Sequence, residues 1–239
     1  MQPGWRERLK DFWHARVRWQ QWVISIILAI VLWPLVMTFV YAVVPPPFSN
    51  VMLTRLMSGN GLYKQWMPLD QMSPWLARAV VSSEDQRFCS HHGVDWVEFQ
   101  DAVGDQVAAG EAPTRGASTI SMQTAKNLFL WDGRSIIRKI LELPLSYYMD
   151  FIWTKHRMLE VYLNIVEWAP GVYGAEAAAQ RHFGKSAAQL TRREAALLAA
   201  VLPNPMKRQA GKPSRHVNLV AARIQFRMAA IDAYLTCIH

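Results

Sequence analysis

Residues 191–205 read TRREAALLAAVLPNP, and this stretch decides the expected fold class of the chain. Thr191 and Glu194 stand three residues apart in a capping-box pattern, in which each side chain can bond a free backbone N–H of the first helical turn. The run rich in alanine and leucine that follows favours helix, and the prolines at 203 and 205 stop it. The stretch therefore predicts a helix that ends before Pro203.

Helix signals of the same kind recur before this stretch and once after it. They are a proline at a first helical position, further capping residues and an amphipathic pattern. The expected helices run from Ser73–Pro74 towards Arg87, from Asp95 to near Gly110, from Ser118 to Leu128, from Ser135 into the 140s, and from Val217 to Leu235. Alternation of apolar and polar residues, which is typical of strands, is scarce. Residues 48–239 are thus predicted to be mainly α-helical.

A long apolar segment precedes these helices. No charged residue occurs between Arg18 and Arg55, and residues 22–44 form an apolar run longer than the ~20 residues that cross a bilayer as a helix. A cleaved signal peptide is the alternative, but its apolar region would be only about 7–15 residues long and would end in a small-residue cleavage site. We therefore expect an uncleaved transmembrane anchor over residues 22–44.

The charges that flank the apolar run predict its orientation. Residues 1–21 carry an excess of arginine and lysine over acidic residues. Basic flanks stay in the cytoplasm, so everything after the anchor is expected outside. The expected organisation is a basic cytoplasmic leader at 1–21, the anchor at 22–44, a linker and membrane-proximal segment at 45–72, and a folded domain at 73–239.

Composition limits the class of partner. Apolar residues make up 51% of the chain and its net charge is +8, so it can bury a core and suits an anionic partner. A phospholipid surface or a diphosphate-bearing substrate fits this charge, whereas no zinc-finger spacing or RNA-binding motif favours nucleic acid. Cys89 and Cys237 lie far apart and indicate neither a disulfide framework nor a metal cluster. A single bridge between them is the less favoured outcome.

Glu84 and Asp85 follow a largely apolar helical stretch at residues 77–81. A carboxylate that is partly desolvated in this position would have a raised pKa and would suit proton transfer near neutral pH. An ordinary solvated turn is the alternative. The nearby His91 and His92 do not predict a metal site, because adjacent histidines do not share a helix face and no other ligand follows at a suitable spacing.

Two further segments could bind an anion. Residues 115–127 form a turn of small residues that enters a helix, whose free N–H groups and dipole favour a phosphate, and Lys126 adds a charge. Arg134, Arg138 and Glu142 are spaced i, i+4, i+8 and share one helix face. There they could hold a diphosphate, or they could form only a salt-bridged surface stripe.

Taken together and in this order, these segments resemble the glycosyltransferase domain of peptidoglycan synthases, a family also found at the front of bifunctional penicillin-binding proteins. Five blocks within residues 84–205 carry the resemblance. They are Glu84-Asp85-x-x-Phe88-x-x-His91-x-Gly93; Gly116-x-Ser118-Thr119-Ile120-x-x-Gln123-x-x-Lys126-Asn127; Arg138-Lys139-x-x-Glu142; Leu159-Glu160-x-Tyr162-x-Asn164 with Tyr173-Gly174 and Phe183-Gly184-Lys185; and Glu194-Ala195-Ala196-Leu197-Leu198-Ala199 with Leu202-Pro203-Asn204-Pro205. Only a short segment follows, so the chain resembles the monofunctional members, which lack a transpeptidase domain.

The resemblance implies a lysozyme-like helical domain with a membrane-associated jaw, behind one transmembrane helix. It implies an inverting transfer that polymerises lipid II into linear glycan strands of peptidoglycan and releases undecaprenyl diphosphate. The implied partners are lipid II, the growing glycan strand and the membrane, and cell-division or elongation proteins are compatible with them. The implied location is the bacterial inner membrane, single-pass, with the N-terminus cytoplasmic and the catalytic domain periplasmic. No organic cofactor, protein-built metal site or nucleic acid is expected, although Mg²⁺ or Mn²⁺ could take part.

The resemblance also implies a role for individual residues. Glu84 would deprotonate the acceptor hydroxyl, and Glu142 would assist at the donor through the diphosphate, its bound metal or positioning. The residues implied in substrate binding are Ser118, Thr119, Gln123 and Asn127 along the groove, and Lys126, Arg134, Arg138 and Lys139 near the leaving diphosphate. Such a transfer needs one base and concentrated positive charge but no strong acid, in contrast to glycoside hydrolysis.

Two alternative functions remain at this stage. A lysozyme-like hydrolase or lytic transglycosylase would use Glu84, but it would not require the line of cations between residues 126 and 138. An inactive membrane-anchored scaffold of the cell-wall machinery would need neither glutamate. Three positions depart from the expected pattern. Ala117 and Met122 stand where the family usually has glycine and glutamine, and Pro144 should kink or interrupt the helix that carries Glu142.

Overall fold

The computed structural model describes residues 5–101, 118–133 and 135–238, with side chains from residue 19 onward. The chain divides into two compact units, Met1–Tyr41 and Ala42–His239. The boundary lies at the end of the apolar segment. The expected linker at residues 45–72 is therefore part of the second unit, where it forms regular structure.

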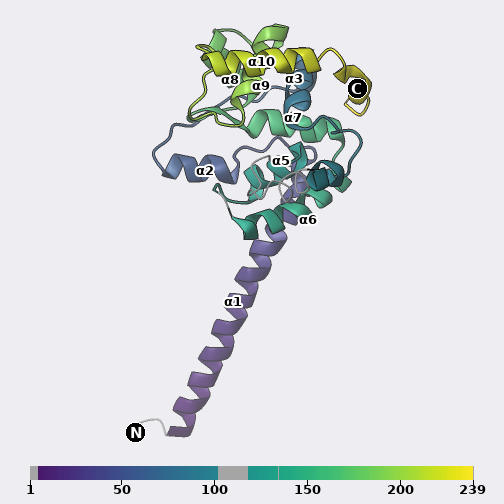
Figure 1. Cartoon of the computed structure of the whole chain (residues 1–239). Coiled ribbons are helices and arrows are strands. Elements are labelled where there is room, and N and C mark those ends of the chain that lie inside the picture. Colours follow the sequence, from purple (N-terminus) through teal and green to yellow (C-terminus); the bar gives the residue numbers. More distant parts are fainter. Residues whose placement is uncertain (1–4, 102–117, 134, 239) are drawn as a thin grey trace, which may run out of the picture. The chain divides into compact units, whose positions relative to one another are not determined.

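The first unit is one helix, α1 (Trp5–Tyr41), which contains Pro34 (Figure 1). Its Trp19–Tyr41 segment is long and apolar enough to cross a membrane. The span ends three positions before the expected Val44, because residues 42–44 form turns ahead of the proline run at 45–47, and a residue before proline disfavours helix. A single N-terminal helix suited to membrane anchoring is thus confirmed within the described residues.

The second unit is mainly helical, as expected. Its α-helices are α2 (Asn50–Met57), α3 (Pro74–Glu84), α5 (Ile120–Phe129), α6 (Ile136–Ile152), α7 (Lys155–Ile165), α8 (Ala175–Phe183), α9 (Arg192–Val201) and α10 (Arg215–Arg227). Residues 96–101 are also helical, and short 3₁₀ helices are η1 (Leu69–Gln71), η2 (Ala187–Gln189) and η3 (Ile231–Tyr234).

A small sheet was not expected. Its strands β1 (Tyr63–Lys64), β2 (Glu167–Ala169) and β3 (Val172–Tyr173) are ordered β1-β3-β2, with β1 parallel and β2 antiparallel to β3. Strands of two or three residues are too short to show an alternating pattern. The turn between β2 and β3 requires Gly171, whose φ is +71° and where a Cβ atom would lie 2.4 Å from the carbonyl oxygen of Gly61.

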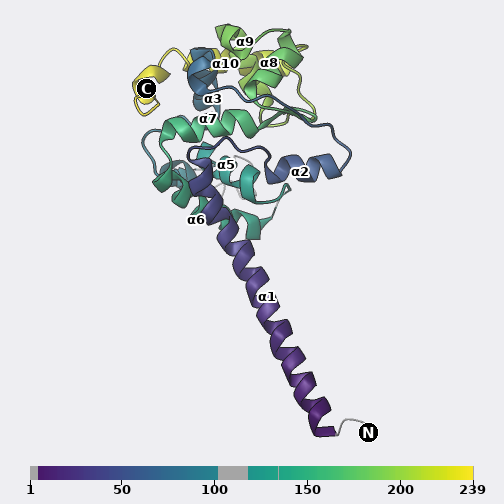
Figure 2. The same ribbon diagram turned by 180° about the vertical axis from the view of Figure 1, so that it is seen from behind.

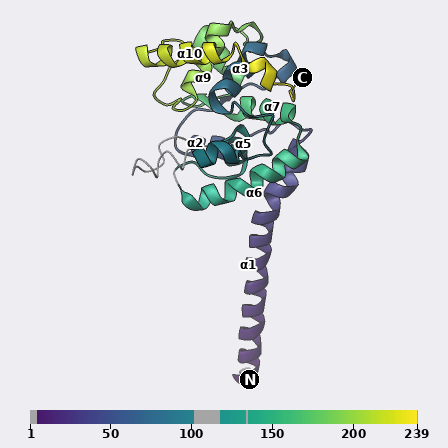
Figure 3. The same ribbon diagram turned by 45° about the vertical axis from the view of Figure 1, so that its right-hand side comes forward.

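The helices of the second unit pack on either side of α7. Helices α3, α9 and α10 contact one another on one side, and α5 contacts α6 and α7 on the other (Figures 1, 2 and 3). Every residue of α7 from Met158 to Ile165 is buried, and so is every residue of α9 from Ala195 to Val201. Helix α7 is thus the buried support between an apolar helix group and the group that carries the charged motifs.

Several helix caps agree with the expectations. Thr191 and Glu194 form both halves of the capping box that begins α9, which ends before Pro203. Ser135 caps α6 by accepting a hydrogen bond from the Arg138 N–H at 3.4 Å. Asp95 accepts hydrogen bonds from the N–H groups of residues 97 and 98, but the expected end of that helix near Gly110 lies outside the described residues.

Two expected helix boundaries near the first motifs were wrong. Helix α3 ends at Glu84 rather than at Arg87, because Asp85 leaves the helical conformation with φ −161° and ψ 76°. Helix α5 starts one residue later than expected. Thr119, not Ser118, is its cap, and its hydroxyl accepts the Met122 N–H at 3.1 Å.

Two further helices differ from the expectation. Of the two effects expected of Pro144, a kink or an interruption, the interruption does not occur, since α6 continues from Ile136 to Ile152 around it. The last expected helix, Val217 to Leu235, is instead α10 followed by the separate 3₁₀ helix η3. An amphipathic pattern does not show such a break, because it records which residues face the core and not where the backbone turns.

The two cysteines form a disulfide. Cys89 and Cys237 are bonded, with their Cα atoms 5.5 Å apart across a sequence separation of 148 residues. Our expectation that the bridge is the less favoured outcome was therefore wrong. The reason is tertiary: η3 returns to contact α3 and brings the C-terminal segment next to the loop after α3.

Candidate active site

Glu84 is the last residue of α3 and faces α5. Its Oε2 accepts a hydrogen bond from Gln123 Nε2 at 3.0 Å, and its Oε1 lies 3.5 Å from the Ser83 hydroxyl. Burial raises the pKa of Glu84 above its ordinary value, the hydrogen bonds from Gln123 and Ser83 oppose this shift, and the charge of Asp85 adds to it. Glu84 is thus a half-buried carboxylate at the end of a helix, which agrees with the expected partial desolvation and not with an ordinary solvated turn.

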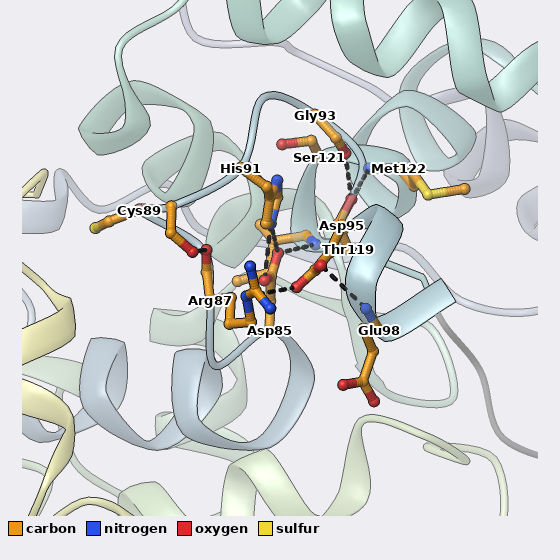
Figure 4. Close-up of polar contacts among 12 residues, drawn as sticks. Asp85, Arg87, Cys89, His91, Gly93, Asp95, Glu98, Thr119, Ser121 and Met122 are labelled. Carbon is orange, nitrogen blue, oxygen red and sulfur yellow. Dashed lines mark hydrogen bonds and ion pairs between the residues drawn. The ribbon is translucent and has the colours of Figure 1, made fainter. Parts of the chain in front are cut away.

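Asp85 has a different environment from its neighbour. This buried carboxylate accepts hydrogen bonds from His91 Nε2, at 2.9 and 3.0 Å from its two oxygens, and from the Ile120 N–H at 2.9 Å (Figure 4). The second contact places a negative charge at the N-terminus of α5, where it is favourable. Asp85 therefore joins the end of α3 to the start of α5 and sets where Glu84 meets α5.

Thr119 strengthens the same junction. Its hydroxyl donates to the Gly93 carbonyl at 2.6 Å while it caps α5 (Figure 4). The side chain is buried, so the structure brings Thr119 to the site but uses its hydroxyl in the fold. Gly93 has φ +79°, and a Cβ atom there would lie 2.7 Å from the Ser146 carbonyl oxygen.

A cluster of charges lies on α6. Arg138 forms an ion pair with Glu142, as the i, i+4 spacing predicts, and Glu142 is almost completely buried. Lys139 Nζ lies 3.2 Å from Glu142 Oε2 and donates to the Ser118 hydroxyl at 2.7 Å. The structure therefore brings Ser118, Arg138, Lys139 and Glu142 together, whereas Arg134 lies outside the described residues.

Gln123, Lys126 and Asn127 share the face of α5 that lines a cavity of about 240 Å³. Burial lowers the pKa of Lys126, the nearby Asp132 opposes this shift, and the charge of Arg138 adds to it. Among the described residues no hydrogen bond or ion pair engages the Lys126 ammonium. An unpaired, half-buried cation beside a cavity can bind an anionic ligand.

Three residues of this cavity were missed by the sequence analysis. Arg55 from α2 pairs with Asp132 at 2.5 Å and approaches Glu167 Oε2 at 3.7 Å. Glu167 Oε1 also accepts the Gly171 N–H at 2.9 Å. Arg55 is the first charged residue after the apolar run, but no sequence signal connects it to residues more than seventy positions away.

Two other polar residues of the fourth block have a structural role. Glu160 accepts the Leu69 N–H at 2.9 Å, and Asn164 bonds both backbone groups of Met67, at 2.9 and 2.8 Å. These contacts satisfy backbone groups that are otherwise left without partners inside the fold. They hold residues 67–69 against α7.

The residues around Glu142 do not fit a protein-built metal site. No group of three histidine, cysteine, aspartate or glutamate side chains with suitable spacing occurs in the described part of the chain. Glu142 itself is already paired with two cationic side chains, which would repel a divalent ion. The site instead offers the Glu84 carboxylate, the cations of α6, and a cavity that Lys126 and Arg55 line.

Comparison with known proteins gives the family. The model of a family described as Transglycosylase matches residues 50–230. A biosynthetic peptidoglycan transglycosylase of Agrobacterium fabrum (strain C58) is 50% identical over 217 residues, which cover 90% of this chain and 95% of that protein. Proteins of the same name from Rhizobium meliloti (strain 1021) and Rhodospirillum centenum (strain SW) are 50% and 51% identical over 81% and 83% of this chain, and over 81% and 86% of their own lengths. The chain belongs to the transglycosylase family.

Proposed function

We propose that this protein polymerises lipid II into the linear glycan strands of peptidoglycan and releases undecaprenyl diphosphate. The observation that carries the proposal is a basic carboxylate close to a cation. The half-buried carboxylate of Glu84 bonds Gln123 on α5, and the ammonium of Lys126, which has no hydrogen bond or ion pair among the described residues, follows one turn later on the same helix face. The names of the similar proteins support the same activity.

In the proposed reaction Glu84 acts as the general base. Its raised pKa makes the ionised carboxylate a stronger proton acceptor, suited to a sugar hydroxyl that loses its proton during attack. The hydroxyl oxygen forms a bond to the anomeric carbon of the donor as the bond from that carbon to the diphosphate oxygen breaks. The bonding electron pair leaves with the diphosphate, and the configuration at the anomeric carbon is inverted.

The cations would stabilise the charge that develops on the leaving group. Lys126 lies beside the cavity and within electrostatic range of Arg138, Lys139 and Glu142. A bound diphosphate would favour the charged form of the lysine and so counter the effect of burial on its pKa. Because a diphosphate leaves readily when its charge is stabilised, the site needs no carboxylic acid to protonate it.

Glu142 would act on the cations and not on the sugar. Its carboxylate fixes Arg138 and Lys139 on one side of the site, so both remain in place before substrate binds. We assign no step to a divalent cation, because these contacts occupy the carboxylate that would be its ligand.

The membrane arrangement completes the proposal. The N-terminal apolar helix indicates membrane anchoring, and the basic leader favours a cytoplasmic N-terminus with residues 42–239 in the periplasm. Helix α6 exposes a row of large apolar side chains on one face: Ile136, Ile137, Ile140, Leu141 and Phe151. Such a surface is costly in water and suits contact with lipid, as expected for a membrane-associated jaw.

The proposal is tested by the product formed. The detergent-solubilised full chain is incubated with labelled lipid II, and separately with preformed glycan strands, beside Glu84→Gln. We expect polymer from lipid II with the unchanged chain and none with Glu84→Gln. Cleavage of preformed glycan without polymer would establish the hydrolase alternative, and the absence of both reactions would favour a scaffold.

A further inference from the structure

Three buried or half-buried side chains from three helices form a chain of hydrogen bonds that ends on the proposed base. The Tyr162 hydroxyl on α7 donates to Gln123 Oε1 on α5 at 3.0 Å. Gln123 Nε2 in turn donates to Glu84 Oε2 at the end of α3 at 3.0 Å. The direction of these two hydrogen bonds follows from the charge of the carboxylate at their end.

An ionised carboxylate can only accept hydrogen bonds, so the side-chain amide must present its NH₂ group to Glu84. The opposite orientation would place the amide oxygen of Gln123 against the carboxylate, which is repulsive. A glutamine amide turns easily between the two orientations unless a partner distinguishes its oxygen from its nitrogen. The tyrosine hydroxyl is such a partner, because it donates to the oxygen.

Tyr162 is well suited to act as a permanent donor. Its side chain is fully buried, and burial together with the charges of Glu84 and Asp85 raises the pKa of its hydroxyl well above the ordinary value. The hydroxyl is therefore a hydrogen-bond donor near neutral pH. Its helix is also held in place, since Glu160 and Asn164 bind the backbone of residues 67–69.

We propose that Tyr162 is a positioning residue, which fixes the amide of Gln123 so that its NH₂ group holds Glu84 ready to take the acceptor's proton. The inference rests on the proposed function, in which Glu84 is the base. Oxygen Oε2 is then occupied by the amide. Oxygen Oε1, whose one hydrogen-bond partner among the described residues is the Ser83 hydroxyl at 3.5 Å, is the oxygen that takes the proton.

Besides the hydrogen bond from Gln123, two charged groups affect the ionisation of Glu84. Asp85, next in the chain, disfavours ionisation of Glu84, and Lys126 on α5 favours it. Both remain when Tyr162 is replaced by phenylalanine. The replacement keeps the buried ring and removes only the donor, so the amide of Gln123 is free to turn and its bond to the ionised carboxylate weakens.

Loss of this bond raises the pKa of Glu84, so the base stays protonated to a higher pH. We expect Tyr162→Phe to move the acidic limb of the kcat/KM profile for lipid II polymerisation up by about one pH unit, since an intramolecular hydrogen bond contributes about 1 kcal/mol and one unit corresponds to 1.36 kcal/mol. At a pH below the midpoint of the limb, a shift of one unit corresponds to about a tenfold loss of kcat/KM. The rate on the alkaline plateau should change much less.

A matched control and a double variant separate positioning from packing. Tyr234→Phe, at an exposed tyrosine of η3, should leave the limb unchanged. Gln123→Met should move the limb in the same direction, and adding Tyr162→Phe to it should move the limb no further, because the hydroxyl acts through the amide. An unmoved limb in Tyr162→Phe, or additive shifts in the double variant, would overturn the inference.

The same set of variants keeps the two proposals distinguishable. If Glu84→Gln polymerises lipid II normally, the base assignment fails and with it the proposed mechanism. If Glu84→Gln is inactive but Tyr162→Phe has the unchanged profile, only the positioning role fails. Thermal unfolding shows whether Tyr162→Phe folds. If it does not, the pH profile of Gln123→Met tests the inference instead. An acidic limb that stays in place in Gln123→Met would refute the hydrogen-bonded support of Glu84.

Discussion

Helices α9 and α5 are of equal length and similarly buried, yet they serve the protein in different ways. Buried residues of α9 are alanine, leucine and valine, and they pack against α3 and α10. Helix α5 has polar residues on its inner face, and it begins against a buried carboxylate and ends beside a cavity. Apolar burial stabilises, whereas buried polar and charged groups cost free energy unless partnered. The packing of α9 therefore stabilises the fold, whereas the polar side chains of α5 lower its stability and serve the proposed reaction.

The largest expected effect is on activity in the α5 region. Glu84→Gln should lower the rate of polymerisation by about 10²–10⁴, the usual contribution of a general base. Its melting temperature should stay the same or rise, because a desolvated carboxylate is removed. Initial rates with labelled lipid II and thermal unfolding measure the two quantities. The exposed Glu98→Gln is the control, and equal losses of rate in both variants would contradict the assignment.

The disulfide is expected to have the next largest effect, on stability. Closing a loop of this length stabilises the fold by at most about 5 kcal/mol in the chain-entropy treatment. Cys89→Ser with Cys237→Ser should therefore melt at a markedly lower temperature, and a reducing agent should do the same to the unchanged chain. The reductant should not affect the double variant. Equal melting of the oxidised and reduced chain would show that the bridge adds nothing.

A cavity created by substitution in α9 should lower the free energy of unfolding and leave the rate of polymerisation unchanged. Leu198 is fully buried, and Leu198→Ala should reduce the free energy of unfolding by about 2–5 kcal/mol. Denaturant titration measures this loss, with the exposed Leu219→Ala on α10 as control. The rate per folded molecule should be unchanged at low temperature. A selective loss of rate would mean that the two regions are coupled.

The smallest effect should come from removing the ammonium of Lys126. Lys126→Met should lower polymerisation about tenfold, because other cations of the site remain. Burial lowers the pKa of Lys126, so its charged form opposes folding at neutral pH, and this variant should unfold at the same or a slightly higher temperature. A clear loss of stability would show that the lysine is a structural cation.

Particular elements show how far sequence reasoning reaches. The capping box at Thr191, the cap at Ser135 and the i, i+4 pair of Arg138 with Glu142 depend on neighbours within one or two turns, so a local pattern predicts them. The end of α3 was missed because Asp85 leaves the helix to bond Ile120, a contact made thirty-five residues away. The same reason applies to Arg55 in the cavity.

By itself the sequence determined the helical class, the apolar anchor, the order of the motifs and the identity of the residues that bear charge. Tertiary structure alone decided that Glu84 is desolvated while Asp85 is a structural acceptor, that Cys89 meets Cys237, and that Tyr162 supports Gln123. The physical reason is that a pKa, a disulfide and a hydrogen-bond direction depend on distances between atoms that the chain brings together only on folding.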